Sequence, residues 1–493
     1  MTEAAGIVIK FKYMQHHSYS MVGENELNKN SIGFWGVVFY AVAVIFPAGA
    51  FAVTGVAAMT FAGETAPLAF LIGGITLFFA IIAVYIFSQK ISNAGGYYKY
   101  VEGATQNRYI SKSIGLWHLF WVIGDMIAAS IIVGWFTWVG LSSLLNYTIP
   151  FYDIVLLSLI VPILYLIVGY FGIKVTARTA ITIGLLQIIL FVTFAIALIV
   201  KTPYNSLSYF NIGNSTNGLY GFFLAMVVGA FLAYGGYGSV VSLGEEAKFS
   251  KVMLKKAIVT ALLIMVAYDT FVVYSIVAAA GPNLSVADSA FAPGLYMTDK
   301  FFGVGVALIA FIFVVFAQIF SPVIFGNSGA RTAFALARDG LLPKNLAKVH
   351  VRYKSPHIAT LWVFIILVIG IFATMTPLVL LLGEANGLFY SWVIWGTAIT
   401  IFTLLYHIVV NNTLVLLIKR MKAKINILSH IVGPSIASVV MIIAIYYSLA
   451  GLTGPMLAVY VLIAAWLIIS VIVIHIRRNK TKVEAVDELV ARG

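Results

Sequence analysis

The sequence predicts an all-α polytopic membrane protein with twelve membrane-spanning helices. Hydrophobic residues make up 62% of the 493-residue chain and charged residues only 10%, whereas soluble domains contain roughly 45–50% and about 25%. The mean hydropathy is +1.02, which excludes a soluble enzyme and a disordered or fibrous chain. The apolar runs are continuous rather than alternating, and this argues against an outer-membrane β-barrel.

Each predicted span rests on an apolar run, because a helix needs about 20 apolar residues to cross the hydrocarbon layer. An even number of spans places both termini on the same side. We expect polar tails at residues 1–31 and 477–493. The predicted spans are 32–60, 66–88, 113–145, 151–172, 176–200, 219–243, 257–281, 302–330, 357–376, 386–417, 429–450 and 454–475.

The basic residues are distributed unequally between the two sides of the predicted bundle. Of the 30 Lys and Arg residues, only Lys201 and Lys300 fall on the side opposite the termini. Basic residues mark the cytoplasmic side of membrane proteins, so we expect a multi-pass protein of the cell membrane with both termini in the cytoplasm. The net charge of +13 is then a topological signal, and we expect no nucleic-acid partner.

The chain lacks the patterns of an enzyme. It contains no cysteine, which excludes disulfides and thiolate metal sites. It also lacks a phosphate loop, an H-E-x-x-H metal motif and a G-x-S-x-G nucleophile motif. No soluble stretch is long enough for a nucleotide-binding domain. We therefore expect no enzyme activity, cofactor, metal or obligatory protein partner, and only membrane lipids and a small-molecule substrate as ligands.

Two predicted spans contain residues that interrupt helices. The first span carries Pro47 and Gly49 near its centre, and the sixth carries three glycines within 235–238. Proline removes a helix donor, clustered glycine lowers the cost of non-helical backbone, and such backbone persists at membrane depth only where it lines a cavity. The alternative for each segment is a simple kink or a packing groove. The spacing of five helices between the two segments favours an inverted repeat with a binding site at the two interruptions.

Four motifs carry a resemblance to a known family. By these motifs, in this order, the chain resembles the amino acid–polyamine–organocation (APC) transporter superfamily. The motifs are Phe46-Pro47-Ala48-Gly49-Ala50-Phe51, Asn93-Ala94-Gly95-Gly96-Tyr97-Tyr98-Lys99-Tyr100, Ala233-Tyr234-Gly235-Gly236-Tyr237 followed by Gly244-Glu245-Glu246, and Arg331 followed by Ala337-Arg338-Asp339-Gly340.

The resemblance implies a LeuT-type fold and an amino acid permease that works by alternating access. Residues 32–200 and 219–418 would be the inverted repeats of five helices each, with discontinuous helices 1 and 6, and residues 429–476 would be two additional helices. The resemblance places the substrate carboxylate at the backbone N–H groups around Ala48, Gly49 and Ala50, where Pro47 removes one donor. It places the substrate amine at the carbonyl groups of Leu232, Ala233 and Gly235, with Tyr234 and Tyr237 nearby.

Ionisable residues inside the spans are candidates for ion coupling, because burying a charge in a membrane is costly. Asp125 in the third span is expected to carry a proton or to pair with a cationic substrate; a structural hydrogen bond is the alternative. For Asp269 in the seventh span, we favour the structural role. Gln187 stands where some relatives have a lysine that occupies the second sodium site. Gln318 and Ser321 could offer oxygen ligands for sodium, but we favour helix packing as their role. We expect a proton gradient rather than a sodium gradient.

The remaining candidates lie near the cytoplasmic side. Glu245, Glu246, Arg331 and Arg338 are expected to form a salt-bridged gate, with a solvated charged surface as the alternative, and His118 is expected at the interface. A carrier of polyamines, other organic amines or nucleobases, and an ion-independent exchanger, remain alternative functions. A channel is less consistent with the sequence, because no ring of polar pore residues is recognisable. A receptor is also less consistent, because we expect a receptor of this fold to carry a longer cytoplasmic tail than residues 477–493.

Overall fold

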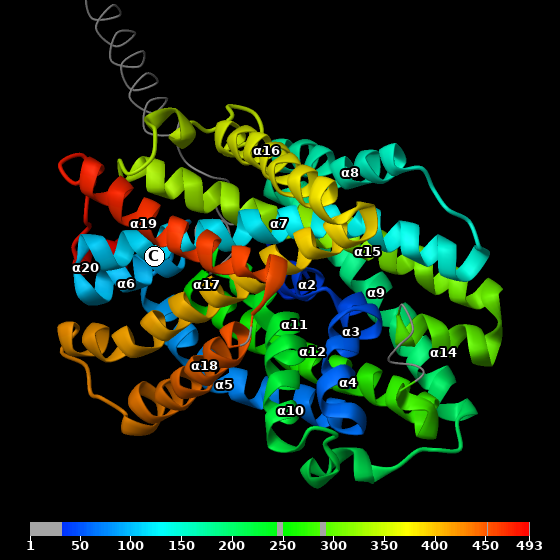
Figure 1. The fold of residues 1–493 in the computed structure, drawn as a ribbon. Coiled ribbons are helices and arrows are strands. Elements are labelled where there is room, and N and C mark those ends of the chain that lie inside the picture. Colours follow the sequence, from blue (N-terminus) through cyan, green and yellow to red (C-terminus); the bar gives the residue numbers. More distant parts are fainter. Residues whose placement is uncertain (1–31, 244–249, 286–291, 451, 493) are drawn as a thin grey trace, which may run out of the picture.

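The computed structural model describes residues 32–243, 250–285, 292–450 and 452–492, which fold into a bundle of helices (Figure 1). Within these residues, eleven helices are long and apolar enough to cross a membrane. The prediction of an all-helical multi-pass protein is thus confirmed. The sixth predicted span corresponds to a shorter apolar segment, Gly218–Tyr234.

Most of the predicted spans are single long helices, and shorter helices connect them. The long helices are α5 (Ala66–Lys90), α7 (Arg108–Leu145), α8 (Phe151–Phe171), α9 (Ile173–Lys201), α12 (Ser250–Ala280), α15 (Val304–Arg338), α16 (His357–Leu382), α17 (Glu384–Arg420), α18 (Gly433–Leu449) and α19 (Ala458–Arg477). The shorter helices that matter below are α6 (Tyr97–Thr105), α14 (Pro293–Phe302) and α20 (Val486–Arg492).

Helix α7 lies at the centre of the bundle, whereas α16 and α19 lie at its periphery (Figure 1). In the most apolar 18-residue window of each helix, 83% of the α7 residues are buried, against 17% in α16 and in α19. The exposed residues of the two peripheral helices are large and apolar, for example Ile369 on α16 and Ile472 on α19. Such a surface is suited to contact with lipid chains rather than water.

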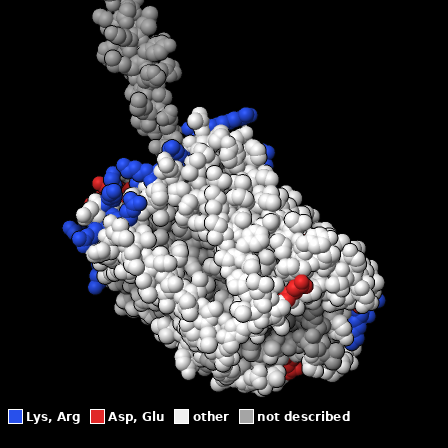
Figure 2. All heavy atoms as spheres, turned by 45° about the horizontal axis from the view of Figure 1, so that its top comes forward, with Lys and Arg blue, Asp and Glu red and all other residues white. Residues whose placement is uncertain are grey.

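Two ends of the bundle can be distinguished, and α5 and α19 run between them. The α4 end contains α4 (Thr54–Ala62), the start of α10 (Gly218–Ala225) and the connection between α18 and α19. The α6 end contains α6, the first turns of α7, the last turn of α15 and α20. Figure 2 shows the Lys and Arg side chains of the visible face gathered mainly at its upper left, while most of that face carries no charge.

A candidate substrate cavity

The first predicted span is interrupted twice. Helix α2 (Phe34–Ile45) ends at Phe46, whose φ of 62° and ψ of 71° lie in the left-handed region that a side chain of this size rarely adopts. A short helix, α3 (Pro47–Ala52), follows and ends at Val53, with φ −133° and ψ −71°, before α4 begins. Pro47 is the first residue of α3. An N–H at this position has no acceptor within the helix, so the lack of an N–H in proline costs no hydrogen bond.

The segment of the sixth predicted span changes its helix type instead of unwinding completely. After α10, residues Met226–Phe231 form the π-helical segment η4, Leu232–Tyr234 form the short α11, and Gly235–Leu243 form the 3₁₀-helical segment η5. Long 3₁₀ segments are uncommon and π segments often mark functional sites. The glycines that the sequence singles out therefore lie at the start of η5, where the helix type changes.

A cavity of about 520 Å³, here called the central cavity, lies between the two interrupted segments and helices α7, α15 and α17. Its wall reaches the α4 end and stops at Trp121, Phe325 and Thr403 on the side of the α6 end. Among the described residues that line it, Asp125 is the only one with a charged side chain. The wall includes Val44, Ile45, Phe46, Val53, Thr54, Phe61, Asp125, Ile132, Tyr220, Phe231, Leu232, Ala233, Gly236, Gln318, Ser321, Trp392, Thr400, Ala450 and Leu452.

The two interrupted segments touch each other beside the cavity. A methyl group at Gly236 of η5 would lie 2.8 Å from the carbonyl oxygen of Val44 and 2.7 Å from its Cγ1 atom. Only a residue without a side chain permits this approach. The absence of a Cβ atom at Gly236 therefore brings the backbones of α2 and η5 together.

The predicted residues of the sixth span lie in different surroundings. Leu232 and Ala233 line the cavity, and Leu232 is 37% exposed. Tyr234 is fully buried, and its hydroxyl donates to the carbonyl oxygen of Phe70 at 3.3 Å. Gly235 begins η5, and the side chain of Tyr237 lies outside the described part of the chain.

Helix α3, which holds Pro47, Ala48, Gly49 and Ala50, is buried, while the cavity wall is formed by residues on either side of it. The Ala48 N–H donates to Oε1 of Gln187 in α9 at 3.2 Å, and the Gly49 N–H donates to the Phe46 carbonyl at 2.7 Å. In addition, the hydroxyl of Tyr268 in α12 donates to the Pro47 carbonyl at 3.0 Å. Two of the donors predicted for the substrate carboxylate thus have protein acceptors in this structure.

Several polar side chains of the cavity wall have no hydrogen-bond partner within the protein. The hydroxyls of Thr54 and Ser321 and both amide atoms of Gln318 are buried without one. Asp125, on α7, has no Lys or Arg of the described residues within ion-pair distance. Buried polar groups are normally paired, so these atoms are the candidates for contact with a bound substrate or ion.

Thr54 is a candidate that the sequence did not single out. It is the first residue of α4, and no side chain caps that helix. The first N–H groups of a helix lack intrahelical acceptors and carry a partial positive charge. Thr54 follows Val53, whose backbone is not helical, and so begins the helix α4. The sequence signal for it would have been a threonine placed shortly after the interruption at Pro47 and Gly49.

The other predicted coupling residue, Asp269, lies away from the cavity wall. It is 1% exposed on α12, and its Oδ2 atom is buried without a hydrogen-bond partner. Its neighbour in sequence, Tyr268, is the residue that contacts Pro47. The functional role of Asp269 stays a prediction.

The predicted gate residues are separated along α15. Arg331 is fully buried, and its Nη1 donates to the carbonyl oxygen of Asn327 at 3.0 Å. Arg338, in the last turn, donates to Oδ1 of Asn93 at 3.3 Å. Glu245 and Glu246 lie outside the described residues, so the salt-bridged gate stays a prediction.

A buried charge cluster occupies the α6 end. The ammonium group of Lys99 lies 2.9 Å from the carboxylate of Glu102 and 2.8 Å from that of Asp339. Lys112 of α7 contacts the same two carboxylates, and the Tyr98 hydroxyl donates to Asp339 at 3.1 Å. These five residues, here called the charge cluster, join α6, α7 and the end of α15.

The charge cluster shifts the pKa values of the Asp339 carboxyl and the Lys99 amine. Burial alone would raise the pKa of the Asp339 carboxyl, but the ammonium groups of Lys112 and Lys99 outweigh burial and hold that pKa below its ordinary value. Burial alone would lower the pKa of the Lys99 amine, but the carboxylates of Asp339 and Glu102 raise it above its ordinary value. Both groups are therefore charged at neutral pH.

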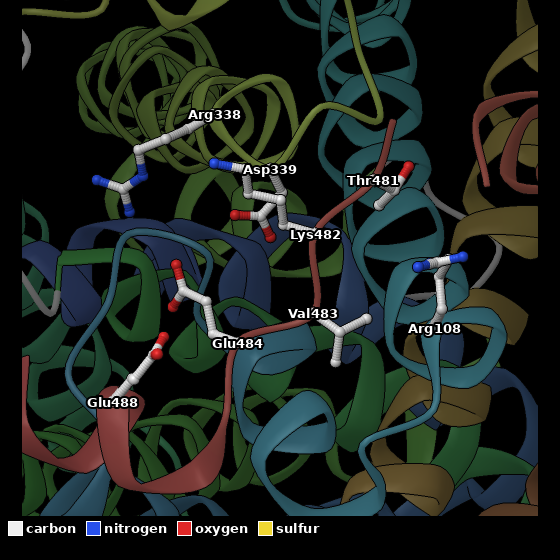
Figure 3. Close-up of a pocket in the computed structure, with 8 residues that line it drawn as sticks. All are labelled: Arg108, Arg338, Asp339, Thr481, Lys482, Val483, Glu484 and Glu488. Carbon is white, nitrogen blue, oxygen red and sulfur yellow. The ribbon is translucent and has the colours of Figure 1, made fainter. Parts of the chain in front are cut away.

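The C-terminal segment docks onto the charge cluster. The Lys482 N–H donates to the Asp339 carbonyl at 2.8 Å, the Glu484 N–H donates to Oε1 of Glu102 at 3.1 Å, and Leu489 is buried with 2% exposure. Beside this contact lies a second pocket, of about 570 Å³. Figure 3 shows its wall, in which the chain from Thr481 to Glu488 faces Arg338 and Asp339.

Comparison with known proteins gives one family. Residues 36–486 match the amino acid permease family. The branched-chain amino acid permease BcaP of Bacillus subtilis is 26% identical over 380 residues, which are 73% of this chain and 77% of that protein. An uncharacterized protein of Methanocaldococcus jannaschii is 26% identical over 333 residues, 65% of this chain and 71% of its own. An uncharacterized transporter of Mycobacterium bovis is 32% identical over 132 residues, 27% of this chain and 29% of its own.

Proposed function

The chain belongs to the amino acid permease family, and we propose on that basis that it carries amino acids with apolar side chains across the membrane in the central cavity, by alternating access. The observation that supports this proposal most is the composition of the cavity wall. A few polar groups lie among mainly apolar side chains, as is usual for small-molecule sites, and Ile132, Phe231 and Phe325 are examples of the apolar part. The name of the Bacillus relative, a branched-chain amino acid permease, agrees with an apolar substrate side chain.

The two charges of the amino acid require opposite partners. The Ala48 and Gly49 N–H groups are already bound to Gln187 and Phe46, so we place the substrate carboxylate at the start of α4, with the Thr54 hydroxyl as an additional donor. A helix N-terminus favours an anion there. The substrate amine then faces the carbonyl groups of Leu232, Ala233 and Gly235, where the sixth segment changes its helix type.

We assign proton coupling to Asp125. Its carboxylate is half-buried in the cavity wall without a cationic partner, so it can exchange a proton with water that enters the cavity. Sodium, with Gln318 and Ser321 as ligands, is the competing ion. The proposal includes the LeuT-type arrangement, with α2–α4 and α10–η5 as the discontinuous helices, in the cell membrane. It also places the α6 end and both termini in the cytoplasm, as the distribution of Lys and Arg favours.

Uptake into proteoliposomes tests the proposal. Labelled leucine, phenylalanine, glutamate and lysine are offered with an imposed pH gradient, a sodium gradient or neither. We expect accumulation of leucine or phenylalanine that requires the pH gradient and falls at least about tenfold in Asp125→Asn, the scale of effect expected when a proton-transfer group is removed. Asp153→Asn, at the first turn of α8 and away from the cavity, is the matched control. Uptake that follows the sodium gradient, or that survives Asp125→Asn, contradicts the coupling.

The unpaired carboxylate of Asp125 also supports a second candidate, a carrier of cationic amines. A polyamine would place an ammonium group against Asp125, where an amino acid with an apolar side chain places none. Labelled putrescine in the same assay separates the two candidates. Putrescine uptake with no leucine or phenylalanine uptake would favour the amine carrier.

A further inference from the structure

A cluster of four aromatic side chains lies between the central cavity and the α6 end. Tyr97 comes from α6, His118 from α7, and Tyr406 and His407 from α17. The ring centroid of Tyr97 lies 5.5 Å from that of His118 and 4.9 Å from that of Tyr406. The ring centroids of His118 and Tyr406 lie 5.7 Å apart. His118 is 3% exposed, so the expectation that it lies at the interface is wrong: the helices α6 and α17 cover this face of α7.

The two histidines differ in how their nitrogen atoms are used. In His407, Nδ1 donates to the Thr403 carbonyl at 2.8 Å and Nε2 lies 3.3 Å from the Tyr97 hydroxyl. In His118, Nδ1 lies 3.0 Å from the Thr332 hydroxyl, whereas Nε2 is buried without a hydrogen-bond partner. With Nδ1–H donating to Thr332, the Nε2 lone pair of His118 is available to accept a proton.

His118 lies between the cavity and the charge cluster. Asp125 follows it by seven residues on α7, which is two helical turns and about 10 Å along the same face. Trp121 stands between them: its ring lines the cavity and lies 5.4 Å from the His118 ring. On the other side, Thr332 precedes Asp339 by the same seven residues on α15. His118 and Thr332 are thus polar groups that lie between the cavity wall and the α6 end in a mainly apolar interior.

We propose that His118 receives the coupled proton from Asp125 and releases it at the α6 end. The Asp125 carboxyl loses its proton and becomes a carboxylate. The proton passes Trp121 by way of water molecules and binds Nε2 of His118. The resulting imidazolium returns to the neutral ring when it passes the proton to water at the α6 end. This inference rests on the proposed proton coupling and names the next residue on the route.

The surroundings of His118 suit transfer rather than storage of a proton. The titratable groups that face it are Tyr97 from α6 and Tyr406 and His407 from α17, all formally neutral, while α15 presents the Thr332 hydroxyl. No carboxylate of the described residues lies within ion-pair distance of His118. A buried imidazolium without a counter-ion is costly, so the proton does not remain there.

Two assays on the same proteoliposomes test the inference. Accumulation of labelled leucine under a pH gradient requires proton transport, whereas counterflow of labelled against unlabelled leucine without a gradient does not. His118→Gln is the test variant. His407→Gln is the matched control, because His407 is equally buried in the same cluster but both of its ring nitrogens are already engaged.

We expect His118→Gln to show counterflow at the wild-type rate. Its gradient-driven accumulation should fall at least about tenfold below that of the wild type, as expected when a proton-transfer group is removed. His407→Gln should keep the wild-type ratio of accumulation to counterflow, even if less protein folds. Accumulation retained in His118→Gln, or both activities lost in parallel, overturns the role of His118 alone. Absence of any effect of the pH gradient on wild-type protein overturns the proposed proton coupling itself.

Discussion

The backbone N–H of Ala48 donates to Oε1 of Gln187, 3.2 Å away, so that a side chain of α9 caps the short helix α3 at the interruption of the first span. Both residues are buried, with at most 1% exposure. Gln187 therefore acts on the backbone of the interrupted helix, which is a positioning role. Its Nε2 atom has no hydrogen-bond partner.

Replacing Gln187 by leucine should destabilise the protein by about 1–3 kcal/mol, because the Ala48 N–H is then buried without an acceptor. The midpoint of thermal unfolding in detergent measures this loss. Leu186→Ala, on the exposed face of the same helix, is the control and should leave the midpoint nearly unchanged. A Gln187→Leu protein as stable as the wild type would show that the hydrogen bond contributes nothing.

Gly236→Ala should abolish transport. The added methyl group would lie 2.8 Å from the Val44 carbonyl oxygen, so α2 and η5 have to separate beside the cavity. Gly396→Ala on α17 is a sharp control, because Gly396 also lines the cavity but has nothing within 4 Å of the added methyl group. Leucine uptake should be lost in the first variant and kept in the second; equal uptake in both would contradict the close contact.

Leu489→Ala should release the C-terminal segment. The Leu489 side chain is 2% exposed and packs over Gly103 of α6, and truncating a buried leucine costs about 2–5 kcal/mol. Limited proteolysis followed by mass spectrometry should detect cleavage between α19 and α20 in the variant but not in the wild type. Asp487→Ala, which changes an exposed residue of the same helix, is the control. If the Asp487→Ala protein were cleaved as fast as the Leu489→Ala protein, the docking role of Leu489 would be refuted.

The docked segment should come loose at acid pH. In the folded protein, burial raises the pKa of the Asp339 carboxyl less than Lys112 and Lys99 lower it, so its pKa lies below the ordinary value. The stabilisation from Asp339 is therefore present above the unfolded pKa of about 3.9 and is lost as the pH falls through the folded pKa. The Lys99 amine has a raised pKa, so its contribution is present below about 10.4 and is lost only as the pH rises through the folded value.

Proteolysis of the tail as a function of pH measures this window. The wild-type tail should be protected around neutral pH and cleaved by an acid-active protease below the folded pKa of Asp339. Asp339→Asn leaves the two buried ammonium groups of the charge cluster with fewer carboxylates, a change that typically costs about 3–5 kcal/mol. This variant should be cleaved at neutral pH as well, and protection equal to that of the wild type would argue against the charge cluster as the anchor.

The sequence predicted the membrane class and the location of the interruptions because both depend on local chemistry. Continuous apolar runs require spans, and Pro47 and the glycines of 235–238 disturb helices wherever they occur. Asp125, Gln318 and Ser321 were also identified, since polar residues inside spans are rare, and the structure places all three in one cavity wall.

What the sequence could not provide is the pairing of helices far apart in the chain. The contact of Ala48 with Gln187 spans 139 residues, and that of Tyr97 with His407 spans 310. Whether a polar residue such as Asp269 faces the cavity or a neighbouring helix depends on the rotation of its helix, which an almost uniformly apolar segment does not reveal. For the same reason His118 looked like an interfacial residue.

The charge cluster has a consequence for the order in which the chain matures during synthesis. Lys99, Glu102 and Lys112 emerge early and leave one positive charge in excess, whereas Asp339 follows Lys112 by 227 residues. Glu484 follows Glu102 by 382 residues. An uncompensated charge is not stable in a dry interior, so the α6 end stays hydrated until α15 is complete. The contact of Glu484 with Glu102 can form only after residue 484 has been synthesised, so the α6 end closes late during biogenesis.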